Sequence, residues 1–120
     1  DPSSPASSKM KEIGEAGGYD GLAPFGPESY DAAALIMLAM ASAKSSDPQV
    51  YKDHVMKVAN GPGELIYPGD LANGITMAGA GLAIDYVGGS SVTLIGPGEA
   101  GGNYREIEIQ NAQIVDVNYR

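Results

Sequence analysis

Side chains that commonly carry out chemistry are sparse in this sequence. His54 is the only histidine, and with no cysteine the chain has no thiolate nucleophile, disulfide or cysteine-based zinc site. His54 stands between Asp53 and Val55 in a helical pattern, without a second histidine or a serine elbow to complete a triad. We therefore expect a structural histidine, no catalytic residue, no metal site and no cofactor.

Glycine-rich stretches superficially resemble phosphate loops. "GAGLAIDYVGG" (79–89) lacks the G-x-G-x-x-G spacing, and the required strand does not precede it. "GPGELIYPGD" (61–70) and "GPGEAGG" (96–102) lack the Lys-Ser/Thr of a nucleotide-binding loop. Turns are the better interpretation of all three.

The carboxylates also have ordinary explanations. Glu106 and Glu108 alternate with apolar residues and should share one solvated face. Asp31 and Asp70 are expected at helix starts, where backbone N–H groups and the helix dipole stabilise a carboxylate without any catalytic reason.

One group of residues suggests a ligand site. Phe25 lies in a loop stiffened by proline and glycine, and Ser29, Tyr30 and Asp31 follow at the expected start of a helix. An aromatic wall, hydroxyl groups and free backbone donors suit a small ligand that carries a carboxylate. Ordinary helix capping and packing is the alternative.

Composition limits the class of protein. The chain has 120 residues, enough for one domain with a modest core, and its 17 glycines and 8 prolines imply many turns. Seven basic and fifteen acidic residues give a net charge of −8, which disfavours binding to nucleic acid.

The pattern predicts helices first and strands last. Residues 1–19 should be a flexible or partly helical lead-in, with one weak turn in 8–17. The apolar run 32–43 predicts a helix that is too short to cross a bilayer and is buried on most sides.

Two further helices should follow. One begins at Ser46 or Asp47 and ends in a left-handed cap at Asn60-Gly61; the other begins at Asp70, with Leu71, Ile75 and Ala78 on its inner face. Strands are expected within 82–88, 91–96, 104–110 and 112–119, with a hairpin turn at 110–113 and Asn111 at positive φ.

The order of four motifs resembles a known family. "SYDAAALIMLAMASA", "SSDPQVYKDHVMKVAN", "YPGDLANGITM" and "IDYVGGSS" follow one another as in the C-terminal part of periplasmic solute-binding proteins of the branched-chain amino-acid class, the receptors of ABC importers. The resemblance covers about residues 20–118. It departs after "IDYVGGSS", where "LIGPGEAGGNY" replaces the family's aspartate-glycine turn.

This resemblance implies an α/β fold: the C-terminal lobe portion of a type I periplasmic-binding protein, with helices followed by short closing strands over residues 20–120. It implies a non-enzymatic, periplasmic receptor that closes on a small amino-acid-like ligand and delivers it to a membrane permease. Phe25 matches an aromatic that can line the family's pocket; Ser29, Tyr30 and Asp31 adjoin it.

The resemblance covers only about the last third of such a receptor. The chain also starts at Asp1 rather than Met, which suggests a trimmed product or a piece of something longer. Apolar faces that other segments cover would then be exposed, so a homodimer is expected. The alternative function is a free-standing α/β interaction module that self-associates, and an upstream signal peptide and α/β lobe in the gene would exclude it.

Overall fold

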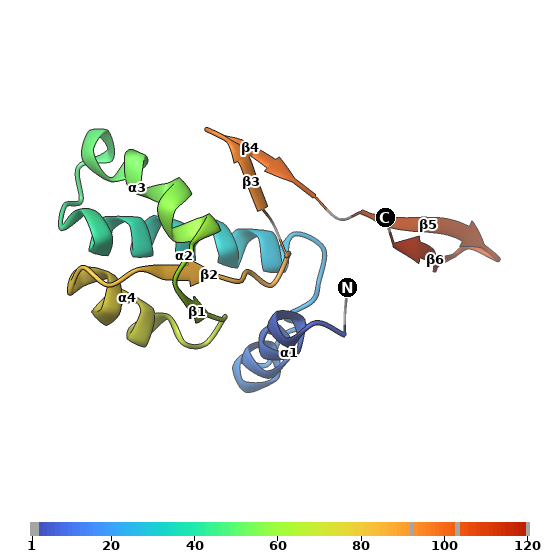
Figure 1. Ribbon diagram of the computed structural model, residues 1–120. Coiled ribbons are helices and arrows are strands. Elements are labelled where there is room, and N and C mark those ends of the chain that lie inside the picture. Colours follow the sequence, from blue (N-terminus) through green and yellow to red (C-terminus); the bar gives the residue numbers. More distant parts are fainter. Residues whose placement is uncertain (1–2, 92, 103, 120) are drawn as a thin grey trace.

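The computed structural model describes residues 3–91, 93–102 and 104–119, and within them the chain is mixed α/β (Figure 1). Within these ranges four helices precede or alternate with short strands, and the last strands form two hairpins. In chain order the elements are α1 Pro5–Gly17, α2 Gly26–Ala43, α3 Pro48–Asn60, β1 Glu64–Ile66, α4 Leu71–Gly79, β2 Ile84–Tyr86, β3 Thr93–Gly96, β4 Glu99–Gly101, β5 Arg105–Gln110 and β6 Gln113–Tyr119. The α/β class expected from the sequence is confirmed at this level.

The core lies where α2 meets α3, α4 and a small parallel sheet. β1 and β2 pair in parallel, with Glu64 opposite Ile84 and Ile66 opposite Tyr86, and α4 connects them as a β-α-β unit. The buried cluster is predominantly aliphatic: Ala34, Leu35, Leu38, Ala39, Val58, Ala59, Ile66, Ala78, Ile84 and Tyr86. Among the described residues, no helix is long and apolar enough to cross a membrane.

Helix α1 replaces the weak turn expected in the lead-in. Ser4 caps it, because its hydroxyl accepts a hydrogen bond from the Ser7 N–H at 3.1 Å, and Pro5 occupies the first helical position. Met10 is 2% exposed, so the helix is anchored by its apolar side.

Helix α2 is buried on one side only. Ala34, Leu35, Leu38 and Ala39 face the core, whereas Ile36 and Met37 are 43% and 41% exposed. The expectation that α2 is buried on most sides is therefore wrong. α3 and α4 both pack against α2, and the stripe of α2 that carries Ile36 and Met37 stays exposed (Figure 1).

Helix α3 begins as the sequence predicts. The Asp47 carboxylate accepts a hydrogen bond from the Gln49 N–H at 2.9 Å, and Pro48 is the first helical residue. Its end differs, because Gly61 has a positive φ of 59° but an extended ψ of −154°. The predicted left-handed cap is wrong, and the chain instead runs out toward β1.

Helix α4 turns inward two of the three residues expected. Ala78 is buried and Leu71 packs against the core, whereas Ile75 is 37% exposed and Gly74 is buried instead. A Cβ on Gly74 would lie 2.8 Å from a methyl carbon of Ile66 and 3.0 Å from one of Leu38. The close approach of α4 to the core thus depends on glycine at this position.

The C-terminal strands form separate antiparallel pairs. β3 pairs with β4, and β5 pairs with β6. The turn between β5 and β6 contains Asn111 and Ala112, which both have positive φ. The predicted positive φ of Asn111 is confirmed, and two successive residues with positive φ are typical of a tight hairpin turn. β1 and β4 were not predicted. The β5–β6 pair projects away from the helices (Figure 1).

Candidate functional site

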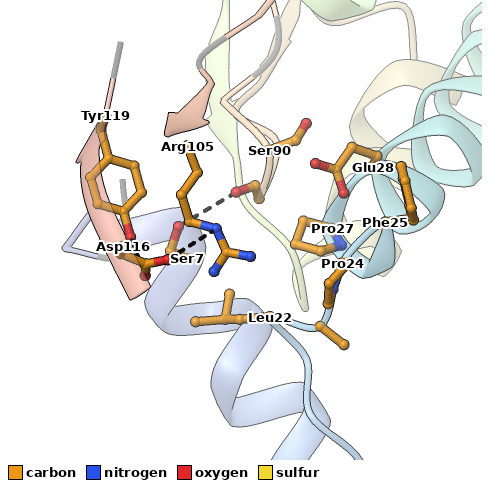
Figure 2. A pocket seen from close by; sticks show the side chains of 12 residues that line it. Ser7, Leu22, Pro24, Phe25, Pro27, Glu28, Ser90, Arg105, Asp116 and Tyr119 are labelled. Carbon is orange, nitrogen blue, oxygen red and sulfur yellow. Dashed lines mark hydrogen bonds and ion pairs between the residues drawn. The ribbon is translucent and has the colours of Figure 1, made fainter. Parts of the chain in front are cut away.

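A cavity of about 380 Å³ lies between α1, the start of α2 and the base of the β5–β6 pair (Figure 2). One wall is apolar, and consists of Leu22, Ala23, Pro24, Phe25 and Pro27. The remaining lining groups are polar or charged: Ser7, Glu28, Gly89, Ser90, Arg105, Asp116 and Tyr119. Of these, Glu28 lies beside Phe25 and Pro27, across from Arg105 (Figure 2). Segments from both ends of the chain therefore contribute to one cavity.

Phe25, in the apolar wall, has an unusual backbone conformation. It precedes α2 with φ 67° and ψ −1°, the left-handed region that side chains other than glycine rarely adopt. The turn around it is fixed because the Gly26 N–H donates to the Ala23 carbonyl at 2.9 Å and the Ser29 N–H donates to the Phe25 carbonyl at 3.0 Å. The ring itself is 79% exposed, so core packing does not account for it.

The charged side of the cavity has one cation and two carboxylates. Arg105 Nε lies 3.5 Å from Asp116 Oδ1, and the Tyr119 hydroxyl donates to Asp116 Oδ2 at 3.4 Å. Glu28 stands in the first turn of α2. Both members of the ion pair are nearly half exposed, and such pairs contribute little to stability, roughly 0–1 kcal/mol. The Arg105 guanidinium can therefore exchange this partner for a ligand at little cost.

Asp31 lies behind the cavity and binds the loop that forms its floor. Its carboxylate is 1% exposed and accepts hydrogen bonds from the Tyr86 hydroxyl and the Gly89 N–H at 2.9 Å each. It also accepts from the Ser90 N–H at 2.8 Å and from the Ser90 hydroxyl. A Cβ on Gly88 would approach Asp31 Oδ2 to 2.4 Å, so this loop requires glycine there.

The interpretation of Asp31 as a helix-start residue is therefore wrong. It lies beyond the first turn of α2, and its partners come from residues 86–90 rather than from the helix's own N–H groups. Asp70, by contrast, does precede α4, although its side chain makes no capping hydrogen bond.

The environment of Asp31 also affects Tyr86. Burial raises the pKa of the Tyr86 hydroxyl far above its ordinary value, and the negative charge of Asp31 and the hydrogen bond to it raise it further. Tyr86 is therefore a stable hydrogen-bond donor that keeps its proton throughout the physiological range.

The loop bound by Asp31 reaches the cavity directly. Gly89 and Ser90 line it, and the buried Ser7 hydroxyl donates to the Gly89 carbonyl at 3.5 Å, which links α1 to the same loop (Figure 2). A Cβ on Gly89 would approach Met10 to 2.4 Å. The loop thus joins α1, α2 and β2 at the cavity floor.

The four residues predicted at the ligand site are placed differently. Phe25 lines the cavity, whereas Ser29 is exposed on α2 and does not line it. The Tyr30 hydroxyl points elsewhere and accepts a hydrogen bond from the Gly69 N–H at 3.0 Å. Asp31 acts from behind the floor through Gly89 and Ser90.

Glu28, Arg105 and Asp116 were not predicted from the sequence. Glu28 could have been found because it adjoins Pro27 in the predicted ligand corner. Arg105 and Asp116 gave no signal, since only the fold brings the C-terminal strands to the start of α2.

A second polar contact involves the single histidine. The Ser42 hydroxyl and His54 Nδ1 are 2.9 Å apart and connect α2 to α3. No carboxylate in the described part of the chain hydrogen-bonds His54 to orient it as a catalytic base. The described residues also include no group of three or more His, Asp or Glu side chains that could hold a metal ion.

Comparison with protein-family models, with curated proteins and with solved structures finds no significant match to this chain.

Proposed function

We propose that this chain is part of an extracytoplasmic, periplasmic solute-binding receptor of an ABC importer, and that its cavity holds a small amino-acid-like ligand. The observation that carries the proposal is the convergence of Phe25, Glu28, Arg105 and Asp116 on one cavity. The order of the four sequence motifs supports the receptor class and its delivery of ligand to a membrane permease.

The cavity has groups for each part of a zwitterion. The Arg105 guanidinium is a planar donor that can bind a ligand carboxylate through two hydrogen bonds. Glu28 and Asp116 can accept hydrogen bonds from an ammonium group. Phe25 and the neighbouring prolines offer an apolar surface for an aliphatic side chain, and a volume of about 380 Å³ is in the range of small-molecule sites.

Titration calorimetry with L-leucine and a panel of other amino acids tests this proposal. Two leucine analogues, 4-methylpentanoate without the ammonium group and isoamylamine without the carboxylate, separate the contributions of the two charges. The amino acid should bind more tightly than either analogue, since each analogue leaves part of the charged rim unmatched.

Variants connect binding to the cavity. Arg105→Gln should weaken L-leucine binding about tenfold or more, because a hydrogen bond to a charged group contributes roughly 1.5–3 kcal/mol. The same variant should scarcely change the binding of isoamylamine. Lys44→Gln is the matched control, because it removes an equal charge at the far end of α2. A folded protein that binds none of the amino acids would refute the proposal.

A further inference from the structure

The side chains that line the cavity at the start of α2 carry an excess of negative charge. The charged members are Arg105, Glu28 and Asp116, one cation and two carboxylates. An amino acid with a neutral side chain is a zwitterion without net charge, so its binding leaves one of the two carboxylates unmatched. A ligand with one further positive charge matches all three groups.

Arg105 and Asp116 are placed to bind the two charged groups at the α-carbon of an amino acid. Arg105 Nε lies 3.5 Å from Asp116 Oδ1, and no described residue accepts a hydrogen bond from the terminal Nη groups of Arg105. A ligand carboxylate can take these donors while the ligand ammonium group approaches Asp116. Because both ligand groups are bonded to the same carbon atom, their partners must be neighbours, as Arg105 and Asp116 are.

Glu28 lies on the opposite wall and takes no part in that pair. It comes from the first turn of α2, beside Phe25 and Pro27 and across the cavity from Arg105 (Figure 2). Among the described residues, its carboxylate has no hydrogen-bond or ion-pair partner. The position of Glu28 therefore corresponds to the far end of a bound amino acid rather than to its α-carbon.

The surroundings of Glu28 favour an organic cation. Phe25 presents an exposed ring on the same wall, and backbone hydrogen bonds fix the turn around it. An ammonium or guanidinium group is attracted both by a carboxylate and by the face of an aromatic ring. Pro24 and Pro27 add an apolar surface for the methylene groups that connect such a cation to the α-carbon.

We propose that the ligand is an amino acid with a cationic side chain, such as lysine, ornithine or arginine, and that Glu28 determines this specificity. The α-carboxylate binds Arg105, the α-ammonium group binds Asp116, and the side-chain cation lies against Glu28 and the ring of Phe25. The inference rests on the proposed function, an amino acid in this cavity, and adds the chemical class of its side chain. Acidic amino acids are disfavoured, because their second carboxylate would face Glu28.

Titration calorimetry at constant ionic strength compares L-lysine with L-norleucine, which has the same carbon chain without the side-chain ammonium group. L-lysine should bind about fivefold more tightly or better, because Glu28 gains an ionic partner and the ring of Phe25 adds to the attraction. Cadaverine keeps two ammonium groups but has no carboxylate, and it should bind at least about fivefold more weakly than L-lysine. Equal binding of cadaverine and L-lysine would assign the cavity to diamines and overturn the proposal.

Glu28→Gln tests the assignment to a single side chain. The substitution keeps the shape of Glu28 and removes its charge, so the preference for L-lysine over L-norleucine should largely disappear. Glu64→Gln is the matched control, because Glu64 is an exposed glutamate on β1 that does not line the cavity, and this variant should retain the wild-type preference. Far-UV circular dichroism verifies that each variant is folded.

The possible results separate this inference from the function on which it rests. If L-norleucine binds the wild type as tightly as L-lysine does, the inference is wrong while the proposed function stands. If Glu28→Gln keeps the wild-type preference, the assignment of specificity to Glu28 is overturned. A folded wild type that binds neither of these ligands nor any other amino acid refutes the proposed function itself.

Discussion

Replacement of Asp31 by alanine should strongly destabilise this small domain. The four hydrogen bonds that its carboxylate accepts would contribute roughly 6–12 kcal/mol if each were worth the 1.5–3 kcal/mol typical of charge-assisted bonds. Burial of a carboxylate without a cation offsets several kcal/mol of that gain. We therefore expect Asp31→Ala to lower the free energy of unfolding by about 4 kcal/mol, out of roughly 6–18 kcal/mol for a chain of this length.

Asp31→Asn removes the charge of the side chain but keeps its shape. The amide oxygen can still accept from Tyr86 and Gly89, but the amide nitrogen then faces the Ser90 N–H, which loses its acceptor. One buried donor without a partner costs about 1–3 kcal/mol, so this variant should lie between Asp31→Ala and the wild type.

Urea unfolding followed by circular dichroism measures these differences. Asp70→Ala is the control, because Asp70 is exposed and makes no capping hydrogen bond, and its effect should stay within about 0.5 kcal/mol. If Asp31→Ala cost less than about 1 kcal/mol, the reasoning would be refuted, because Gly89 and Ser90 could not then depend on this carboxylate in solution.

Three further outcomes follow from the same region. Unfolded Tyr86 loses its proton near pH 10 whereas the folded residue keeps it, so wild-type stability should fall above pH 10 by up to about 1.4 kcal/mol per pH unit. Urea unfolding between pH 9 and 11 should show that the free energy of unfolding falls less in Tyr86→Phe than in the wild type. In the exposed control Tyr104→Phe it should fall as much as in the wild type. Phe25→Gly should be about 1 kcal/mol more stable than Phe25→Ala in thermal melts, since glycine adopts a positive φ without the steric cost that a Cβ brings. Both variants should bind ligand equally poorly. Gly88→Ala should destabilise the wild type by more than about 2 kcal/mol, because the added Cβ would meet the Asp31 carboxylate. In an Asp31→Ala background the same substitution should cost much less, and a double-mutant cycle measures the difference.

Helix starts could be predicted where the signal is local. The Asp47-Pro48 pair specifies a cap and a first helical residue within two positions, and the structure places α3 there. The turn at Asn111 is similar, because short-range backbone preference decides it. β1 lacks such a signal: a three-residue strand between glycines and prolines forms because β2 lies beside it.

The candidate site was less predictable, because its parts are distant in sequence. Phe25 could be found beside the predicted helix start, but Arg105 reaches the same cavity only through the path of the β5–β6 pair. The role of Asp31 was misjudged for the same reason, since its donors lie more than fifty residues further along the chain. A carboxylate just ahead of ten consecutive apolar residues was the one local hint that it is buried.

The projecting β5–β6 pair implies that the chain does not unfold as one cooperative unit. Its ladder has almost no tertiary contact to protect it, whereas the amides of Gly89 and Ser90 are held by a buried carboxylate. In hydrogen exchange the hairpin amides should therefore exchange through local opening, and the loop amides only when the core opens. One measurement can therefore monitor the opening of the hairpin and the stability of the core separately.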